Sequence, residues 1–346
     1  MLSLTYKPYN LKKKHVFRIA RGARTSTPLV LTRITFEGVS GYGEASMPPL
    51  YGESVESTMA FYQQLDLSQF QNPFELETIL NYVDQVAPGH PAAKAAIDIA
   101  LHDLIGKLLK IPCYQYFGLP ASQKAYTSKT IGIDTPDVVK ERVLEAKEFQ
   151  YLKIKLGSDT DKEIIQAVRE VSNQALYIDA NQGWTDRNKA LEMIYWLQEQ
   201  GTVMIEQPMP VDQVVDLAWL SEKSPLPIIG DEGVQRLPDV LKAKHIYNGV
   251  NIKLMKSTGL REAYQMIVLA KSMGLKVMLG CMSETSCAIS AAAQLAHHAD
   301  FVDLDGNLLV TNNPYLGVGL EQGKLQLSNT PGLGLAPVDW EAIQGE

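Results

Sequence analysis

A chain of 346 residues exceeds the usual length of one compact domain and suits a β/α barrel joined to a smaller domain. Its composition, 45% hydrophobic and 21% charged, is typical of a globular protein with ample material for a core. The formal net charge of −7 is distributed without a block of like charge, which argues against a surface that binds nucleic acid or an anionic membrane.

The sequence also predicts the compartment in which the protein works. Its apolar runs stay well below the roughly 18 residues of a membrane span. The N-terminal lysines follow the first apolar residues, unlike the arrangement of a secretory signal. Cys113, Cys281 and Cys287 are an odd number of cysteines without paired spacing. We therefore expect a reduced, cytoplasmic protein that does not bind membranes.

Residues 1 to about 120 have mixed α and β character. Residues 29–36 (LVLTRITF) alternate in polarity and are rich in β-branched side chains, which predicts a strand. Residues 91–110 (PAAKAAIDIALHDLIGKLLK) are rich in alanine and leucine and carry apolar side chains at helical spacing. This pattern predicts a long helix.

The central part of the chain alternates between short β-branched runs and helical stretches. Such alternation is typical of a (β/α)₈ barrel. Five of the intervals between the polar ends of successive runs are 22 to 27 residues, enough for one strand, one helix and two loops. The segment after the last run lacks a clear helical pattern. The eight runs are YTSKTIGI, YLKIKLG, ALYIDANQGW, TVMIEQP, LPIIGDEG, GVNIKLM, LKVMLGCMSE and FVDLDG.

Three of these runs, consecutive along the chain, end in a carboxylate: Asp179, Glu206 and Asp231. Because the C-terminal ends of barrel strands open onto one mouth, we expect these side chains to converge there. Three converging carboxylates repel one another unless they hold a cation, and a set of oxygen ligands without His or Cys favours Mg²⁺ over Zn²⁺. The alternative is that each acid caps the helix that follows it.

Lysines flank these acids in the sequence. Lys153 and Lys155 alternate on one strand and so point to the same side, into the mouth, and Lys253 follows a later strand. A nearby divalent cation lowers the pKa of a lysine towards the range of a general base. Two such lysines on opposite sides of a substrate could remove a proton from one face and return it to the other, whereas we assign Lys256 to the surface.

Histidine and cysteine do not compete for this role. The six histidines precede the barrel or lie in helix-like segments. Cys281 is at a strand end, but a thiol nucleophile requires an activating base beside it. The sequence therefore favours proton transfer by lysine over covalent catalysis.

Six motifs carry these residues: AAKAAIDIALHD (92–103), KIK (153–155), DANQGW (179–184), EQP (206–208), GDEG (230–233) and NIKLMK (251–256). Together they resemble the muconate-lactonizing subgroup of the enolase superfamily, over nearly the whole chain. The resemblance implies an α/β fold with a modified (β/α)₈ TIM-type barrel, residues 123–310. Residues 1–122 would form an α+β capping domain, and residues 311–346 a C-terminal segment that packs back on it.

The same resemblance implies roles for the strand-end residues. One Mg²⁺ per subunit would be bound by Asp179, Glu206 and Asp231. Lys155 and Lys253 would be the two acid/base catalysts. Lys153 would contact the substrate carboxylate and support Lys155.

The last run narrows the choice among the reactions of this family. Asp303 and Asp305 form a D-x-D pair that resembles the pair of the dipeptide epimerases, where it holds the α-ammonium group of the substrate. We therefore expect a small dipeptide to be epimerised at its C-terminal residue. The alternatives are an N-acylamino acid racemase, an o-succinylbenzoate synthase or a cycloisomerase on the same scaffold, with the aspartates merely forming a turn before Gly306. A binding or structural protein that kept the fold is a further alternative.

Specificity is expected from two loop-like stretches, residues 17–28 and 45–54. In Ala-Glu epimerases an arginine of the first loop binds the glutamate carboxylate, and Arg18, Arg21 and Arg24 are candidates here. Counting from Phe17 places Gly22 at that position, so apolar side chains remain open as well as glutamate.

Two further residues are expected to bind substrate, and the protein is expected to form a homo-oligomer. Thr130 and Met282, in the first and seventh runs, are assigned to substrate binding. Homo-oligomers are common among such folds, and we keep this as an expectation.

Overall fold

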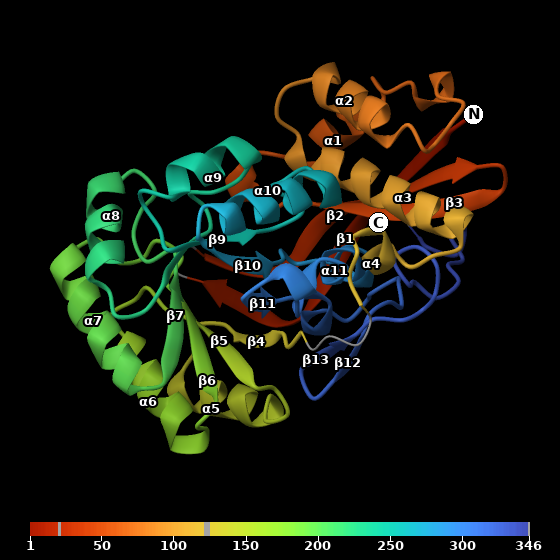
Figure 1. The fold of residues 1–346 in the computed structure, drawn as a ribbon. Coiled ribbons are helices and arrows are strands. Elements are labelled where there is room, and N and C mark those ends of the chain that lie inside the picture. Colours follow the sequence, from red (N-terminus) through yellow and green to blue (C-terminus); the bar gives the residue numbers. More distant parts are fainter. Residues whose placement is uncertain (20–21, 121–124, 345–346) are drawn as a thin grey trace.

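The computed structural model describes residues 1–19, 22–120 and 125–344. Within them lie an antiparallel sheet of three strands, a parallel sheet of eight strands and a small antiparallel hairpin (Figure 1). The helices α5 to α10 surround the parallel strands from outside (Figure 1). This arrangement confirms the predicted barrel with an α+β part beside it. Among the described residues, the longest helices lack the apolar length that crossing a membrane would take.

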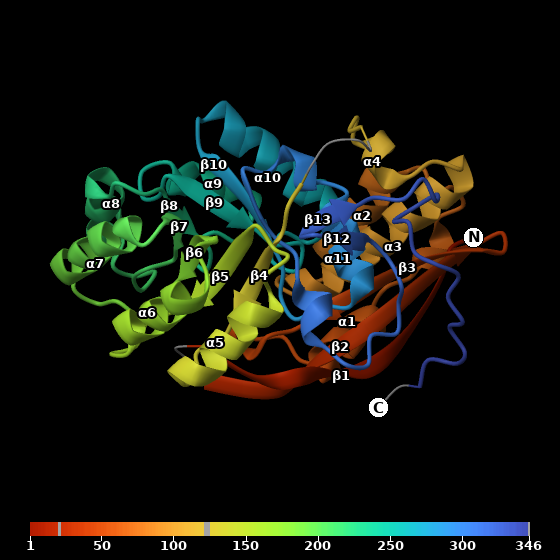
Figure 2. The same ribbon diagram turned by 90° about the horizontal axis from the view of Figure 1, so that it is seen from below.

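The antiparallel sheet has the order β1-β2-β3. Its strands are β1 (Ser3–Ile19), β2 (Gly22–Phe36) and β3 (Val39–Ser46). The predicted strand 29–36 is therefore confirmed, but the described residues of the stretch 17–28, which are 17–19 and 22–28, do not form a loop. They belong to the two arms of a long hairpin whose pairing shifts register between Lys12 and Phe17. The hairpin runs along the barrel towards α5 (Figure 2).

One helix is packed tightly against this sheet. The predicted helix 91–110 is α3 (Pro91–Leu109), and nearly all its residues are buried because alanine and leucine occupy every face. Its backbone approaches β3 at Gly41 and Gly43; a Cβ atom on Gly43 would lie 2.0 Å from the carbonyl oxygen of Ala96. The other elements of this part are η1 (Pro49–Tyr51), α1 (Val55–Tyr62), η2 (Leu67–Gln69), α2 (Leu76–Val86) and α4 (Cys113–Tyr116).

Each of the eight predicted runs contains one strand of the parallel sheet, and neighbouring strands follow in chain order. The strands are β4 (Ser128–Ile131), β5 (Tyr151–Lys155), β6 (Ala175–Asp179), β7 (Thr202–Glu206), β8 (Ile228–Gly230), β9 (Gly249–Ile252), β10 (Lys276–Gly280) and β11 (Phe301–Asp303). The intervening helices are α5 (Pro136–Glu145), α6 (Asp161–Val171), α7 (Arg187–Glu199), α8 (Val214–Lys223), α9 (Leu237–Ala243), α10 (Leu260–Ser272) and α11 (Ser286–Ala293), followed by η3 (Ala296–His298).

The last unit departs from the regular repeat. After β11 the chain forms the short 3₁₀ helix η4 (Gly306–Leu309). Side chains join β11 to β4: Ser128 Oγ donates to Asp303 Oδ1 at 2.7 Å, and Thr127 Oγ1 accepts from the backbone N–H of Leu304 at 2.7 Å. These contacts bring the two edges of the barrel together without a ladder of backbone hydrogen bonds.

The barrel interior has an apolar layer below its mouth. Tyr177, Met204, Ile229 and Met278 are buried together, and Phe301 packs against them. Because side chains alternate along a strand, Tyr177, Met204 and Ile229 lie directly beneath the strand-end acids two residues further on. This layer forms an apolar floor beneath the acids.

The C-terminal segment contacts the first part of the chain. It contains β12 (Gly319–Glu321) and β13 (Lys324–Gln326). The backbone N–H of Leu333 donates to Asp103 of α3 at 2.9 Å, and Lys7 Nζ of β1 donates to the carbonyl of Trp340 at 2.7 Å. The division of the chain after residues 122 and 310 stays a prediction.

Replacing Gly43 with alanine should destabilise the protein. The new methyl group would overlap the α3 backbone, and we expect the free energy of unfolding to fall by about 3 kcal/mol. Urea denaturation measures this difference. Gly319→Ala is the control, because a Cβ there would meet its nearest atom at 3.4 Å. Equal stability of Gly43→Ala and Gly319→Ala would contradict the close approach.

Candidate active site

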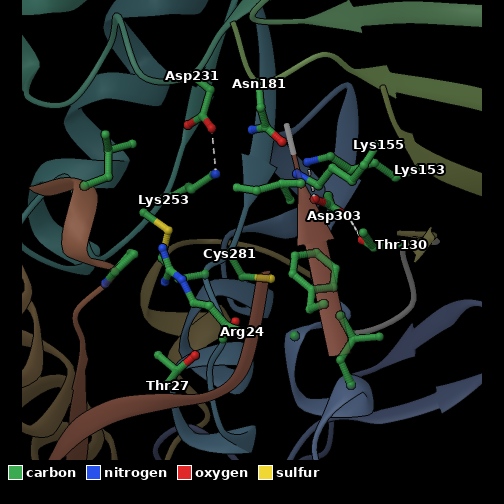
Figure 3. A pocket seen from close by; sticks show the side chains of 18 of the residues that line it. Arg24, Thr27, Thr130, Lys153, Lys155, Asn181, Asp231, Lys253, Cys281 and Asp303 are labelled. Atoms are coloured by element: carbon green, nitrogen blue, oxygen red, sulfur yellow. Dashed lines mark hydrogen bonds and ion pairs between the residues drawn. The ribbon is translucent and has the colours of Figure 1, made fainter. Parts of the chain in front are cut away.

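A cavity of about 540 Å³ opens at the C-terminal end of the barrel strands. Lys153, Lys155, Asp231, Lys253 and Asp303 line it (Figure 3). The lysines of β5 face Lys253 across this space, and β5 and β9 are four positions apart in the order of eight strands. The structure therefore brings the predicted lysines together from opposite sides of the mouth.

The three predicted metal ligands are buried at the same end. Glu206 is 0% exposed, and its Oε2 lies 2.7 Å from Lys153 Nζ. Asp179 Oδ2 lies 2.5 Å from Lys155 Nζ and 3.2 Å from Lys153 Nζ. Asp231 Oδ2 lies 2.8 Å from Lys253 Nζ. Each acid is thus charge-paired with a lysine that points into the mouth.

These contacts shift the pKa values strongly. Burial, together with the charges of Asp179 and Asp231, raises the pKa of Glu206 to about 7. Burial alone would also raise the pKa of Asp179, but Lys155 and Lys153 lower it to about 2. Burial would lower the pKa of Lys253, yet Asp231 and Glu206 hold it well above its usual value. In the protein alone, the carboxylates therefore oppose the lowering of the Lys253 pKa that is expected beside a cation.

The donor set suits a magnesium ion. Three carboxylates without His or Cys are the oxygen ligands that Mg²⁺ prefers. Glu206 Oε2 is buried without a hydrogen bond of good geometry, and the mutual repulsion seen in its pKa is the kind that a cation relieves. In the described part of the chain, no three His, Cys, Asp or Glu side chains are grouped closely enough to hold a metal ion. The positive charge beside these acids comes instead from lysine ammonium groups.

The prediction that Lys256 lies on the surface is wrong. Its side chain is 1% exposed, and Nζ donates to Oδ1 and to the carbonyl oxygen of Asp231, both at 2.6 Å. The residues after Lys253 form a tight turn, which points Lys256 back to Asp231. Asn251 was also missed; its Nδ2 donates to Glu206 Oε1 at 2.8 Å. The motif NIKLMK contains both residues, but the direction of Lys256 depends on this turn.

The D-x-D pair lies at the opposite edge of the cavity from Asp231. Asp303 Oδ2 accepts from Lys153 Nζ at 2.7 Å. Asp305 accepts from the backbone N–H of Thr130 at 2.7 Å and from its hydroxyl at 3.0 Å. Lys153 holds the pKa of Asp303 below its usual value against the effect of burial, whereas burial raises the pKa of Asp305. Thr130 therefore positions the pair that the sequence singled out.

The hairpin β1–β2 forms the outer wall of the cavity. Arg24 is half-buried and points into the cavity, where Gly22 and Met282 also lie (Figure 3). Arg18 does not face it; its guanidinium pairs with Asp134 at 2.9 Å, and its carbonyl accepts from the backbone N–H of Ile133 at 3.0 Å. Arg21 lies outside the described residues.

Two buried acids behind the cavity were not found from the sequence. Glu284 Oε1 accepts from the backbone N–H of Met282 at 2.8 Å, and Glu44 accepts from the backbone N–H of Thr285 at 2.8 Å. Burial raises the pKa of Glu44 to about 7, and burial with the nearby Glu44 raises that of Glu284 to about 8. These acids support the loop after β10 that carries Met282.

The fold and the mouth define a β/α-barrel protein with lysines and carboxylates paired across one cavity. Two family models match it: mandelate racemase / muconate lactonizing enzyme, N-terminal domain, over residues 4–118, and enolase C-terminal domain-like over residues 137–342. The chain therefore belongs to the mandelate racemase / muconate lactonizing enzyme family, with its enolase-like C-terminal domain. The predicted resemblance is confirmed.

Individual proteins are similar over almost the whole chain. The L-Ala-D/L-Glu epimerase of Bacteroides thetaiotaomicron is 54% identical over 338 residues, 97% of this chain and 88% of the relative. The crystal structure of the dipeptide epimerase from Enterococcus faecalis V583, complexed with Mg and L-Leu-L-Tyr, has a TM-score of 0.90 and 31% identity, covering 96% and 99% of the two chains. The N-succinyl Arg/Lys racemase from Bacillus cereus has a TM-score of 0.90 and 30% identity, covering 98% and 95%.

Glu284→Gln should change how stability depends on pH. With its pKa raised to about 8, Glu284 keeps its proton in the folded state after the unfolded chain has lost it, so stability falls as pH rises from about 4.5 to 8. Glutamine removes this contribution and keeps the acceptor for Met282. We expect the loss of unfolding free energy between pH 5 and pH 7.5 to shrink by about 2 kcal/mol.

Urea denaturation in metal-free buffer at both pH values measures this effect. The matched control is Glu192→Gln, since Glu192 is exposed on α7. The same pH dependence in Glu284→Gln and in the parent protein would contradict a shifted Glu284.

Proposed function

We propose that the protein is a Mg²⁺-dependent dipeptide epimerase that inverts the α-carbon of the C-terminal residue by 1,1-proton transfer. The observation that carries this proposal is the placement of lysines from β5 and β9 on opposite sides of one cavity. The named activities of the similar epimerases support it. The reaction needs one group on each face of a carbon atom, and the cavity offers both.

Asp179, Glu206 and Asp231 would hold the ion. When bound, Mg²⁺ supplies positive charge that stabilises the negative charge developing next to the α-carbon as its proton leaves. Lys256 and Asn251 keep Asp231 and Glu206 in place through the hydrogen bonds described above. The apolar floor below the acids excludes water and strengthens these charge interactions.

Lys155 and Lys253 act as the acid and the base. The lysine that is neutral takes the proton from the α-carbon, and the lysine that is charged returns a proton to the other face. Their roles exchange when the opposite stereoisomer is the substrate. Lys153 binds the substrate carboxylate and supports Lys155, with which it shares the contact to Asp179.

The other end of the dipeptide is held by the D-x-D pair. Asp303 and Asp305 accept hydrogen bonds from the α-ammonium group, and Thr130 keeps Asp305 directed into the cavity. A dipeptide is a zwitterion, so its ammonium group complements the two acids of this pair. An N-acyl substrate has no ammonium group to fill the acidic pole.

The favoured dipeptide is L-Ala-Glu. Arg24 points into the cavity from the hairpin and is suited to bind a side-chain carboxylate. The 54% identical relative is named an L-Ala-D/L-Glu epimerase, which supports the same choice. Counting from Phe17 places Gly22 where the carboxylate-binding arginine is expected. In this proposal Arg24 fills the role of that arginine. Contacts of Arg21 and Met282 with the substrate stay predictions.

The main alternative function is that of an N-acylamino acid racemase. The similarity to the N-succinyl Arg/Lys racemase supports this alternative. Turnover of L-Ala-L-Glu and of N-acetyl-L-Ala-L-Glu separates the two functions. We expect epimerisation of the free dipeptide and almost none of the acetylated one. Faster reaction of the acetylated compound would favour the racemase, and reaction of neither would overturn the proposal.

Two expectations about the protein's surroundings remain proposals. The three cysteines are free, as a reducing cytoplasm requires. Association into a homo-oligomer is proposed by analogy with similar folds.

Lys155→Ala and Lys253→Ala should each abolish epimerisation, by at least about 100-fold. Each variant keeps one lysine, so exchange of the α-proton with solvent should survive for one stereoisomer and differ between the variants. Proton NMR in heavy water with L-Ala-L-Glu and L-Ala-D-Glu measures both. Lys223→Ala is the control, since Lys223 is exposed on α8. Full activity in both variants would exclude the two lysines.

Glu206→Gln should weaken Mg²⁺ binding roughly tenfold or more, because an amide oxygen lacks the carboxylate charge. Isothermal titration with MgCl₂ measures the affinity without relying on catalysis. Glu192→Gln serves again as the matched control. Unchanged affinity in Glu206→Gln would contradict its place among the ligands.

A further inference from the structure

Lys13 is a cation in the cavity wall that the proposed reaction does not use. It lies on β1, is half-buried, and lines the cavity together with Arg24 of β2. Its ammonium group donates to Ser283 Oγ. Within residues 1–19, 22–120 and 125–344, no carboxylate lies within ion-pair distance of Lys13 or Arg24.

Two cations that share a wall, with no carboxylate in direct contact, are costly to the folded protein. Burial lowers the pKa of Lys13 to about 8; Cys281, Asp305 and Glu284 act to raise it, and Arg24 lowers it further. Burial likewise lowers the pKa of Arg24. The charge of Arg24 therefore disfavours that of Lys13, and an anion between them would relieve both this repulsion and the loss of hydration.

The charges already assigned to the two ends of the dipeptide leave Lys13 unused, and Arg24 beside it has been assigned only to the side chain. The main-chain carboxylate belongs to the lysines of β5 and the three acids, and the α-ammonium group to Asp303 and Asp305. The cations Lys13 and Arg24 on the hairpin therefore predict a third charged group, an anion, on the substrate. In a dipeptide, that group is a side-chain carboxylate.

We propose that Lys13 is a specificity-determining residue that binds, beside Arg24, the side-chain carboxylate of the residue being epimerised. This inference rests on the proposed function and deepens it. Lys13 supplies a point charge from β1, and Arg24 a planar fork from β2, so an acidic side chain is held from both arms of the hairpin. A neutral side chain of equal size leaves the two cations unpaired and binds more weakly.

The competing role for Lys13 is purely structural. Its hydrogen bond to Ser283 ties β1 to the loop after β10 and could merely hold the hairpin closed. In that case, removing the Ser283 hydroxyl would have the same effect as removing the ammonium group. Ser283→Ala therefore separates the tether from the charge.

The experiment compares L-Ala-L-Glu with its neutral isostere L-Ala-L-Gln as substrates of the Mg²⁺-loaded full chain. Lys13→Met should lower the Glu/Gln ratio of kcat/KM roughly tenfold or more, through KM for the glutamate substrate. Lys13→Arg should keep most of the ratio, because it retains the charge. Ser283→Ala should also keep it.

The matched control is Lys14→Met, since Lys14 is the exposed neighbour of Lys13 and does not line this cavity. It should leave the ratio unchanged. An unchanged ratio in Lys13→Met, or an equal fall in Ser283→Ala, would overturn the inference. If the parent protein epimerises neither dipeptide, the proposed function itself fails, which is a separate outcome.

The pH profile gives a second readout. The Lys13 ammonium loses its charge above about pH 8, so KM for L-Ala-L-Glu should rise there while KM for L-Ala-L-Gln changes less. Glu284 also titrates near this pH, and Cys281, Asp305 and Arg24 face the same group. The substrate ratio cancels changes common to both substrates. Lys13→Arg should flatten the ratio above pH 8, and identical profiles in Lys13→Arg and the parent would count against Lys13.

Discussion

The site depends on a layer of opposite charges held at the end of the barrel strands and shielded from water. Asp179 and Glu206 lie where β6 and β7 end, and Lys153 bridges them from β5. Because side chains alternate along a strand, the same strands that carry charges at the mouth carry Tyr177 and Met204 one layer below. Burial makes each carboxylate costly without a partner, so the lysines and acids stabilise one another's positions. A reactive arrangement is thereby present before substrate arrives.

The rest of the molecule holds this layer in place through a few buried polar contacts. Asp98 and Asp103 of α3 face different parts of the chain. Asp98 accepts from the backbone N–H of Leu260 at the start of α10, and Asp103 accepts from those of Tyr42 and Leu333. One helix therefore joins the antiparallel sheet, a barrel helix and the C-terminal segment. The capping part and the barrel share a core through this helix.

The barrel and its charged mouth could be predicted because both follow from local patterns. Strand runs recur at a regular spacing, and a charge at the end of an apolar run has one place to go in this fold. Lys256 could not be placed in this way, because its direction is set by a turn after β9. Of the hairpin β1–β2, only residues 29–36 were predicted as a strand. The rest was missed, and within it the pairing shifts register between Lys12 and Phe17. Glu44 and Glu284 are buried by packing between distant segments, which no local pattern records.

The lysines proposed to act on the α-carbon and the cations proposed to bind the substrate's side chain lie on separate pieces of the chain. The former sit on rigid strand ends, and the latter on a hairpin that meets the barrel through the carbonyl of Arg18 and the pairing of Lys13 with Val310. Lys13 and Arg24 of the hairpin take no part in the ion pairs that hold Lys155 and Lys253. New substrates can thus be acquired in evolution by altering a peripheral ribbon, while the chemistry beneath it is inherited unchanged.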